Sequence, residues 1–193
     1  MRHAKSAWPE GVADRDRPLG PRGLRDAPAA GRFLAESAGR PDLVLCSPAR
    51  RARGTWELAA AALDGPVPTR LDARVYGADA AELLDVLHGV PDDVGTLLLV
   101  GHNPGLEELV LLLAAGTEEA AGEEGTAGAD GPARAAGVDA VPPGPDGLLE
   151  RVRAKFPTSA IAVLTWHGTW TGLGAGGARL ADLAVPRGAG RTS

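Results

Sequence analysis

The sequence contains little cysteine, few aromatic residues and almost no lysine. Its one cysteine, Cys46, excludes an internal disulfide and a cluster of cysteine metal ligands, and favours a reducing, cytoplasmic location. Aromatic residues make up 4% of the 193 residues, so a core must be built from Ala, Val and Leu. Of the 20 basic residues, only Lys5 and Lys155 are lysines. Arginine is the default cation of this chain, and a single arginine is therefore weak evidence for a site.

Long apolar runs and a strong net charge are also lacking. The longest apolar runs, 97–100 and 109–115, are far shorter than the roughly 20 residues of a membrane-spanning helix, and residues 1–11 carry charges and no apolar stretch. We therefore expect no secretory signal and no membrane partner. The net charge is −5, but residues 117–147 hold seven acids and one base, so the remainder is nearly neutral and offers no basic surface for nucleic acid.

Short apolar segments alternate with helical patterns along the chain. Residues 42–46 and 96–100 are almost continuously apolar, as expected for parallel strands that are buried on both faces. A third apolar run covers 160–166. Helical patterns lie at 23–37, 49–63, 79–87 and 105–115. This alternation predicts one layered α/β domain that spans residues 1–193.

Residues 117–147 interrupt this pattern. They are rich in Ala, Gly, Glu and Pro and show no apolar periodicity. Such a segment buries too little apolar surface to offset an ordering cost of about 1–2 kcal/mol per residue. We interpret it as a mobile acidic surface insertion, with a short solvated helix inside it as the alternative.

Polar residues follow both well-defined strands. Ser47 to Arg51 come directly after the first strand, where Ser47 and Pro48 suit an N-cap and a first helical turn, and Gly101 to Asn103 come after the second. Ligands of parallel α/β sheets bind beyond the carboxyl ends of the strands. If Arg2 and His3 join these residues, two histidines and one or two arginines would form an anion site suited to a phosphoryl group.

The chain carries an ordered set of motifs: RHAKS at 2–6, RPLGPRG at 17–23, SPARRARGT at 47–55, GHNPG at 101–105, and KFPTSA at 155–160 followed by Trp170 and by Pro186 and Arg187. This set resembles the histidine phosphatase superfamily, and more narrowly its small SixA-type phosphohistidine phosphatase branch. The resemblance implies a three-layer sandwich of the phosphoglycerate mutase type. Such a fold has a mostly parallel central sheet with helices on both faces.

The resemblance also implies a set of catalytic residues. His3 would be the nucleophile that forms a covalent phosphohistidine, and Arg2, Arg51 and His102 would surround the phosphate. Neutral imidazole is a competent nucleophile near pH 7, and arginine offers forked donors to phosphate oxygens. In the family pattern the phosphate-binding arginine directly precedes Ala and stands four residues before Thr, which selects Arg51 over Arg50. His102 is expected to donate to the same oxygens as a cation.

Further candidates are less firmly placed. We expect Ser47 and Asn103 to contribute to substrate binding, and Arg17 to be either a loop residue that closes over the substrate or an ordinary surface arginine. The motifs identify no general acid that would protonate a leaving group, and Asp72 is the available candidate for this role. We expect the small branch to need no such acid, because a phosphorus–nitrogen bond breaks more readily than a phosphate ester.

The remaining reactive side chains receive structural interpretations. His88 is expected to cap a helix or lie on the surface, His167 to lie in an exposed turn, and Cys46 to be a buried small hydrophobe. The histidines do not have the spacing of zinc ligands, so we expect neither a metal nor another cofactor.

The start of the chain departs from the family pattern. Relatives begin with a hydrophobic strand that delivers the Arg-His pair, whereas Met1 directly precedes Arg2 here. Either the start codon is assigned too far downstream, which we favour, or the protein lacks a central strand and carries His3 on a frayed terminus. In the second case the amino group of Met1 would add a mobile cation near the phosphate.

The predicted function is hydrolysis of phosphohistidine on a protein partner. The chain has little room for the cap that encloses small substrates in larger relatives, and an open site suits a protein. The alternatives are a phosphatase of small phosphate esters and a degenerate module that binds phosphate or phosphoprotein. We expect a monomer.

Overall fold

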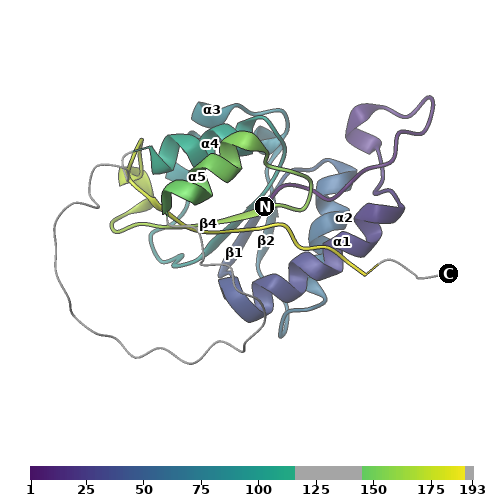
Figure 1. Cartoon of the computed structure of the whole chain (residues 1–193), viewed down its shortest axis with the longest axis horizontal. Helices are drawn as coiled ribbons and strands as arrows, with labels where there is room; N and C mark the ends of the chain where they lie inside the picture. Colours follow the sequence, from purple (N-terminus) through teal and green to yellow (C-terminus); the bar gives the residue numbers. More distant parts are fainter. Residues whose placement is uncertain (116–144, 190–193) are drawn as a thin grey trace.

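The computed structural model describes residues 1–115 and 145–189, which form an α/β fold (Figure 1). A parallel sheet has the strand order β2–β1–β3, and a second, antiparallel sheet pairs β4 with β5. The strands are β1 (Leu43–Cys46), β2 (Thr69–Leu71), β3 (Leu97–Val100), β4 (Ile161–Thr165) and β5 (Arg179–Ala184). The α-helices are α1 (Pro21–Phe33), α2 (Arg50–Ala60), α3 (Ala80–His88), α4 (Gly105–Ala114) and α5 (Pro145–Ala154).

Helices cover both faces of the parallel sheet, as predicted. Leu45 of β1 and Leu99 of β3 pack in one core with α3, α4 and α5, whereas Val44 and Cys46 of β1 face α1 and α2. Figure 1 shows these two groups of helices on opposite sides of the strands. Successive strand residues point to opposite faces, so continuously apolar strands serve both cores.

The apolar segments of the sequence locate three of the five strands to within about a residue, and the other two have no comparable run. β2 is three residues long and exposed throughout, and β5 mixes buried with exposed positions. Most of the predicted insertion at 117–147 lies outside the described residues, so its interpretation stays a prediction. Its last three residues belong to α5, which begins at Pro145.

The first residues of the chain lie between β3 and the segment that enters β4. Arg2 forms a parallel bridge with Gly101 on one side, and its backbone N–H donates to Ala160 O at 2.9 Å on the other. The ammonium of Met1 is buried and donates to Leu99 O at 2.7 Å. Burial lowers the pKa of this amino group to about 5. The amino group is therefore fixed, and the expectation of a mobile cation beside the site is wrong.

A cavity of about 520 Å³ continues from Met1 between β3 and β4. Leu97 to Leu99 line one side, and Ala162 to Leu164 line the other. In the described part of the chain, β3 pairs with β1 and β4 pairs with β5, so the facing edges of β3 and β4 have no strand between them.

No helix in the described ranges is long and apolar enough to cross a bilayer.

Candidate active site

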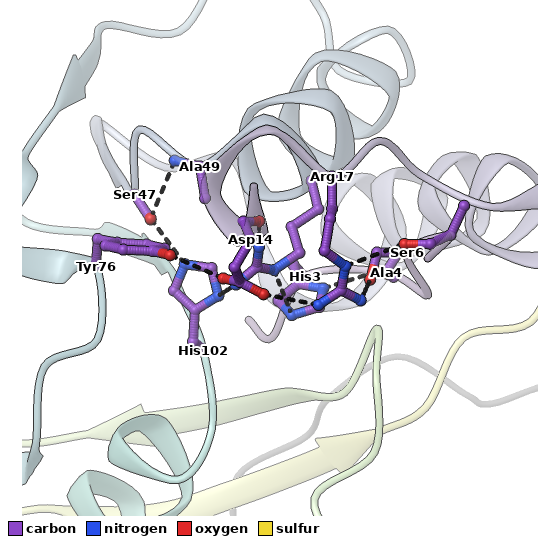
Figure 2. Close-up of polar contacts among 11 residues, drawn as sticks. His3, Ala4, Ser6, Asp14, Arg17, Ser47, Ala49, Tyr76 and His102 are labelled. Carbon is purple, nitrogen blue, oxygen red and sulfur yellow. Dashed lines mark hydrogen bonds and ion pairs between the residues drawn. The ribbon is translucent and has the colours of Figure 1, made fainter. Parts of the chain in front are cut away.

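Three segments meet where the parallel strands end. The first turn of α2 after β1 supplies Arg51. The start of the chain supplies His3 and the turn after β3 supplies His102, which Figure 2 shows close together. The centroids of the two imidazole rings are 5.1 Å apart. The guanidinium of Arg51 lies between them, with Nε 3.2 Å from His3 Nε2 and Nη2 3.3 Å from His102 Nδ1. Arg51 is buried and Arg50 is exposed, so the helix turns the arginine selected from the motif toward the histidines.

His3 is a neutral imidazole, and one of its two ring nitrogens carries no proton. Its Nδ1 is 2.7 Å from the carbonyl oxygen of Ala4, which can only accept, so Nδ1 carries the proton. Nε2 therefore presents a lone pair, toward the Nε–H of Arg51. Burial lowers the pKa of His3 to about 3, and the positive charge of Arg51 acts in the same direction. Near pH 7 this nitrogen can attack an electrophile without prior loss of a proton.

His102 has the opposite tautomer. Arg51 can only donate, so His102 Nδ1 is the acceptor, and Nε2–H donates to Ser47 Oγ at 2.7 Å. Burial, followed by the charge of Arg51, lowers the pKa of His102 to about 4. The cationic state expected for the complex is thus not the state of this structure. Ser47 also accepts the N–H of Ala49, but the N-cap of α2 is Ala49, so the assignment of Ser47 as N-cap is wrong.

Two residues that the motifs did not indicate complete this cluster. Asp14 Oδ2 accepts from Arg51 Nη2 at 2.9 Å and from the hydroxyl of Tyr76 at 2.8 Å. Its Oδ1 accepts from Arg17 Nη1 at 2.7 Å. The hydrogen bond from Tyr76, with those from Arg17 and Arg51, lowers the pKa of Asp14 to about 2. A carboxylate three residues before Arg17, in a short helical turn, was the available signal for Asp14.

Arg17 is buried, with 6% of its surface exposed, which excludes the reading of it as an ordinary surface arginine. Besides Asp14 it donates to Ser6 Oγ at 2.6 Å and to Ala7 O at 3.1 Å. Its guanidinium carbon lies 3.1 Å from the ring centroid of Trp8. Arg17 therefore reaches the histidine cluster through the carboxylate of Asp14.

Arg2 and Asn103 form a second polar group. Arg2 Nη1 and Asn103 Nδ2 both donate to the carbonyl of Phe156, at 2.6 and 3.2 Å, and Asn103 Nδ2 also donates to Glu107. The charge of Arg2 acts to lower the pKa of both His3 and His102. Arg2 Nε and Asn103 Oδ1 are buried and have no hydrogen-bond partner among the residues that the structure describes.

Asp72 is not placed as a general acid. It follows β2, accepts from Arg74 Nη2 at 2.7 Å and caps the 3₁₀ turn Ala73–Val75. The hydrogen bond from Arg74 holds the pKa of Asp72 below its usual range. A carboxyl that is ionised near pH 7 has no proton to give, so the structure argues against this prediction.

Other side chains lie apart from the cluster. The thiol of Cys46 is buried, which raises its pKa to about 12, so it is protonated and unreactive. His88 Nε2 lies 2.7 Å from Leu173 O, and His167 is exposed. Within the described ranges, no group of three His, Cys, Asp or Glu side chains could hold a metal ion.

An α/β fold that brings two histidines onto one buried arginine beyond its strand ends has the donors of an anion site, as in enzymes that bind phosphoryl groups. Comparison with known proteins narrows this class. The sequence profile of the histidine phosphatase superfamily (branch 1) matches residues 1–80. The chain is 41% identical over 187 residues to an uncharacterised protein of Mycobacterium tuberculosis, covering 97% of this chain and 100% of the relative. The chain belongs to the histidine phosphatase superfamily and is a phosphatase.

Solved structures place the fold within this superfamily. A protein from Nakamurella multipartitia assigned as the phosphohistidine phosphatase SixA matches with a TM-score of 0.75 and 29% identity, over 96% of this chain and 93% of that one. A counterpart from Agrobacterium tumefaciens matches with a TM-score of 0.68 and 27% identity, over 96% and 94%. The family and the fold that the motifs predict are thereby confirmed.

Proposed function

We propose that the protein hydrolyses phosphohistidine on a protein substrate through a covalent intermediate on His3. The observation that carries this proposal is the unprotonated Nε2 of His3, which lies beside Arg51 in a buried ring 5.1 Å from the imidazole of His102. SixA-assigned proteins at 29% and 27% identity support the same substrate class.

The first step forms a bond between His3 Nε2 and phosphorus and breaks the bond from phosphorus to the substrate imidazole. That imidazole keeps the proton already on its other nitrogen and leaves neutral. In the second step a water oxygen attacks phosphorus and the bond to His3 breaks. His3 leaves as a neutral imidazole with its proton still on Nδ1, and both protons of the water stay with the product, dihydrogen phosphate. Arg51 and Arg2 stabilise the charge on the phosphoryl oxygens in both steps. His102 joins them by taking up a proton on Nδ1 when the phosphoryl anion binds, because a nearby negative charge favours the cationic imidazole.

The state of the nearby carboxylates favours a nitrogen leaving group over an oxygen leaving group. In the part of the chain that the structure describes, Asp14 is the carboxylate in contact with Arg51. Its pKa is about 2 and that of Asp72 is lowered, so neither holds a proton near neutral pH. An alkoxide needs such a proton, whereas an imidazole that leaves neutral does not. This difference favours phosphohistidine over small phosphate esters, the second candidate.

The rim of the site supports a protein substrate. Residues 8–16, which carry Asp14 into the cluster, are exposed to solvent, and 74% of Trp8 is exposed. Exposed tryptophan is typical of surfaces that bind proteins. Because Trp8 stacks on Arg17, a partner on this surface would lie next to the arginine pair.

Trapping of the intermediate tests the proposal. A protein phosphorylated on histidine with radiolabelled phosphoramidate is mixed with the enzyme and quenched in alkali, where phosphohistidine survives. We expect label on His3 and no hydrolysis by His3→Ala, whereas His167→Ala, at an exposed histidine, behaves as wild type. Hydrolysis that survives in His3→Ala would exclude His3 as nucleophile.

The same preparation separates the alternatives. Faster turnover of sugar phosphates than of the phosphohistidine protein would favour the small-ester phosphatase. Binding of the phosphoprotein without turnover or label would favour a degenerate binding module.

A further inference from the structure

The structure assigns Asp14 a second role: it is an internal ligand of the phosphoryl site, which the substrate phosphoryl group must displace. This inference rests on the proposed function, because it takes Arg51 as the phosphoryl-binding arginine. Figure 2 shows the Asp14 carboxylate between Tyr76 and Arg17, next to His102, and Arg51 donates to the same carboxylate. The ring centroids of Tyr76 and His102 are 5.5 Å apart.

Asp14 uses the donors that a phosphoryl group on His3 would need. Arg51 Nη2 donates to the Asp14 carboxylate at 2.9 Å, and Nη1 donates to the Asp14 backbone carbonyl at 2.6 Å. Nη2 also contacts His102 Nδ1, and Nε faces His3 Nε2. Four of the five N–H groups of Arg51 are thus engaged, two of them by Asp14. A phosphoryl group attached to His3 would lie beside an ionised carboxylate, and two anions at such distances repel.

The loop that carries Asp14 has little else to hold it. Residues 8–16 are exposed throughout, and the 3₁₀ turn Asp14–Asp16 contains no buried residue. The side-chain bonds from Arg17, Arg51 and Tyr76 all end on Asp14. A segment with so few buried apolar contacts opens at low cost once its polar anchor is released.

Displacement also selects the ligand by charge. Asp14 offers one negative charge to the arginines, whereas a phosphoryl group offers close to two, with three acceptor oxygens. A dianionic phosphoryl group therefore exchanges favourably with Asp14. A carboxylate on an acidic protein surface carries the same single charge as Asp14, so its exchange with Asp14 gives no gain in binding free energy.

Binding of inorganic phosphate, measured by titration calorimetry at pH 7.5 and fixed ionic strength, tests the inference. Asp14→Asn keeps the shape of the side chain and removes the competing charge, so we expect its phosphate affinity to rise about tenfold. Asp16→Asn removes one charge from the same exposed turn and serves as the matched control, with a change below about twofold. Hydrogen exchange of residues 8–16 in the wild-type chain should become faster when phosphate binds.

The outcomes separate this inference from the proposed function. If Asp14 instead holds Arg51 in position for phosphate, Asp14→Asn binds phosphate more weakly, and the inference is overturned. Equal affinity in the two aspartate variants, or slower exchange of the loop with phosphate bound, overturns it as well. Failure of wild type to bind phosphate, or binding that survives in Arg51→Met, would instead count against the proposed function.

Discussion

At the scale of single residues, the candidate site depends on which nitrogen of each histidine carries the proton. Two neighbouring groups determine these proton positions. The carbonyl of Ala4 can only accept a hydrogen bond, and the guanidinium of Arg51 can only donate one. They leave His3 Nε2 and His102 Nδ1 as unprotonated nitrogens that face one cation. The fork of Arg51 is what allows a single side chain to reach both rings.

We predict that Arg51→Lys lowers kcat on a phosphohistidine protein by about a hundredfold or more, because a single ammonium cannot replace the two-armed contact with His3 and His102. Steady-state kinetics measures the loss. Arg50→Lys, at the exposed neighbouring position, is the control and should stay within about twofold of wild type. Wild-type turnover by Arg51→Lys, with the melting temperature unchanged, would contradict the role given to the guanidinium.

At the scale of elements, α1 and α2 approach closely enough that one glycine is required. A methyl group on Gly31 of α1 would meet the backbone carbonyl oxygen of Ala59 in α2. We expect Gly31→Ala to lower the free energy of unfolding in urea by about 1–3 kcal/mol, because the helices must separate.

Gly54 in the interior of α2 gives a matched control for Gly31. A methyl group there would lie 3.5 Å from Leu19 Cδ1, an ordinary contact. We expect Gly54→Ala to raise the free energy of unfolding by up to about 1 kcal/mol, through helix propensity. Destabilisation of similar size in both variants would show that helix spacing is not the cause.

The cavity of about 520 Å³ between β3 and β4 lies next to Met1 and has a mostly apolar lining. We predict that a chain carrying four apolar residues ahead of Met1 melts higher, by about 5 °C or more, than one carrying four Gly and Ser residues there. Side chains of the added strand would fill the cavity, and a peptide N–H would replace the buried amino group beside Leu99. Turnover should rise too, since His3 follows this segment. Equal melting temperature and turnover in the two chains would contradict the prediction.

At the scale of the whole molecule, stability is expected to depend on pH through three buried groups. The pKa values of His3 and His102, about 3 and 4, lie below the ordinary 6.5, and that of the Met1 amino group, about 5, lies below 8.0. In these windows the unfolded chain binds more protons than the folded chain, so stability rises with pH. The free energy of unfolding should therefore fall from pH 8 to pH 5.

Urea unfolding at several pH values measures this slope. Replacing both His3 and His102 by Asn should reduce the slope of the free energy of unfolding between pH 5 and 6.5. The smaller slope that the Met1 amino group causes should remain up to pH 8. The single variant His167→Asn, at an exposed position, should leave the curve unchanged. A curve that is flat or rises toward acid in the wild-type chain would contradict the assignment of these groups as buried and neutral.

The sequence by itself determined the family, the α/β fold and the meeting of His3, Arg51 and His102. Those residues follow strands that an apolar run makes visible, or a motif with fixed spacing, and parallel strands bring their carboxyl ends to one edge of the sheet. A local sequence pattern therefore predicts a contact between residues that are far apart in the chain. The same reasoning missed β2 and β5, whose residues are too exposed to leave an apolar run.

Only the tertiary structure decided the role of the polar residues around that meeting point. Asp14 and Tyr76 come from irregular segments, and they lie 37 and 62 residues from the partners that join them to the cluster. The path of such a loop follows from no periodicity, so the contact between the Asp14 carboxylate and Arg51 could not be predicted. The three-residue spacing of Asp14 and Arg17 indicates only their own ion pair. The proton positions on His3 and His102 follow from the same contacts, because a tautomer is set by whichever donor or acceptor the fold places beside each nitrogen.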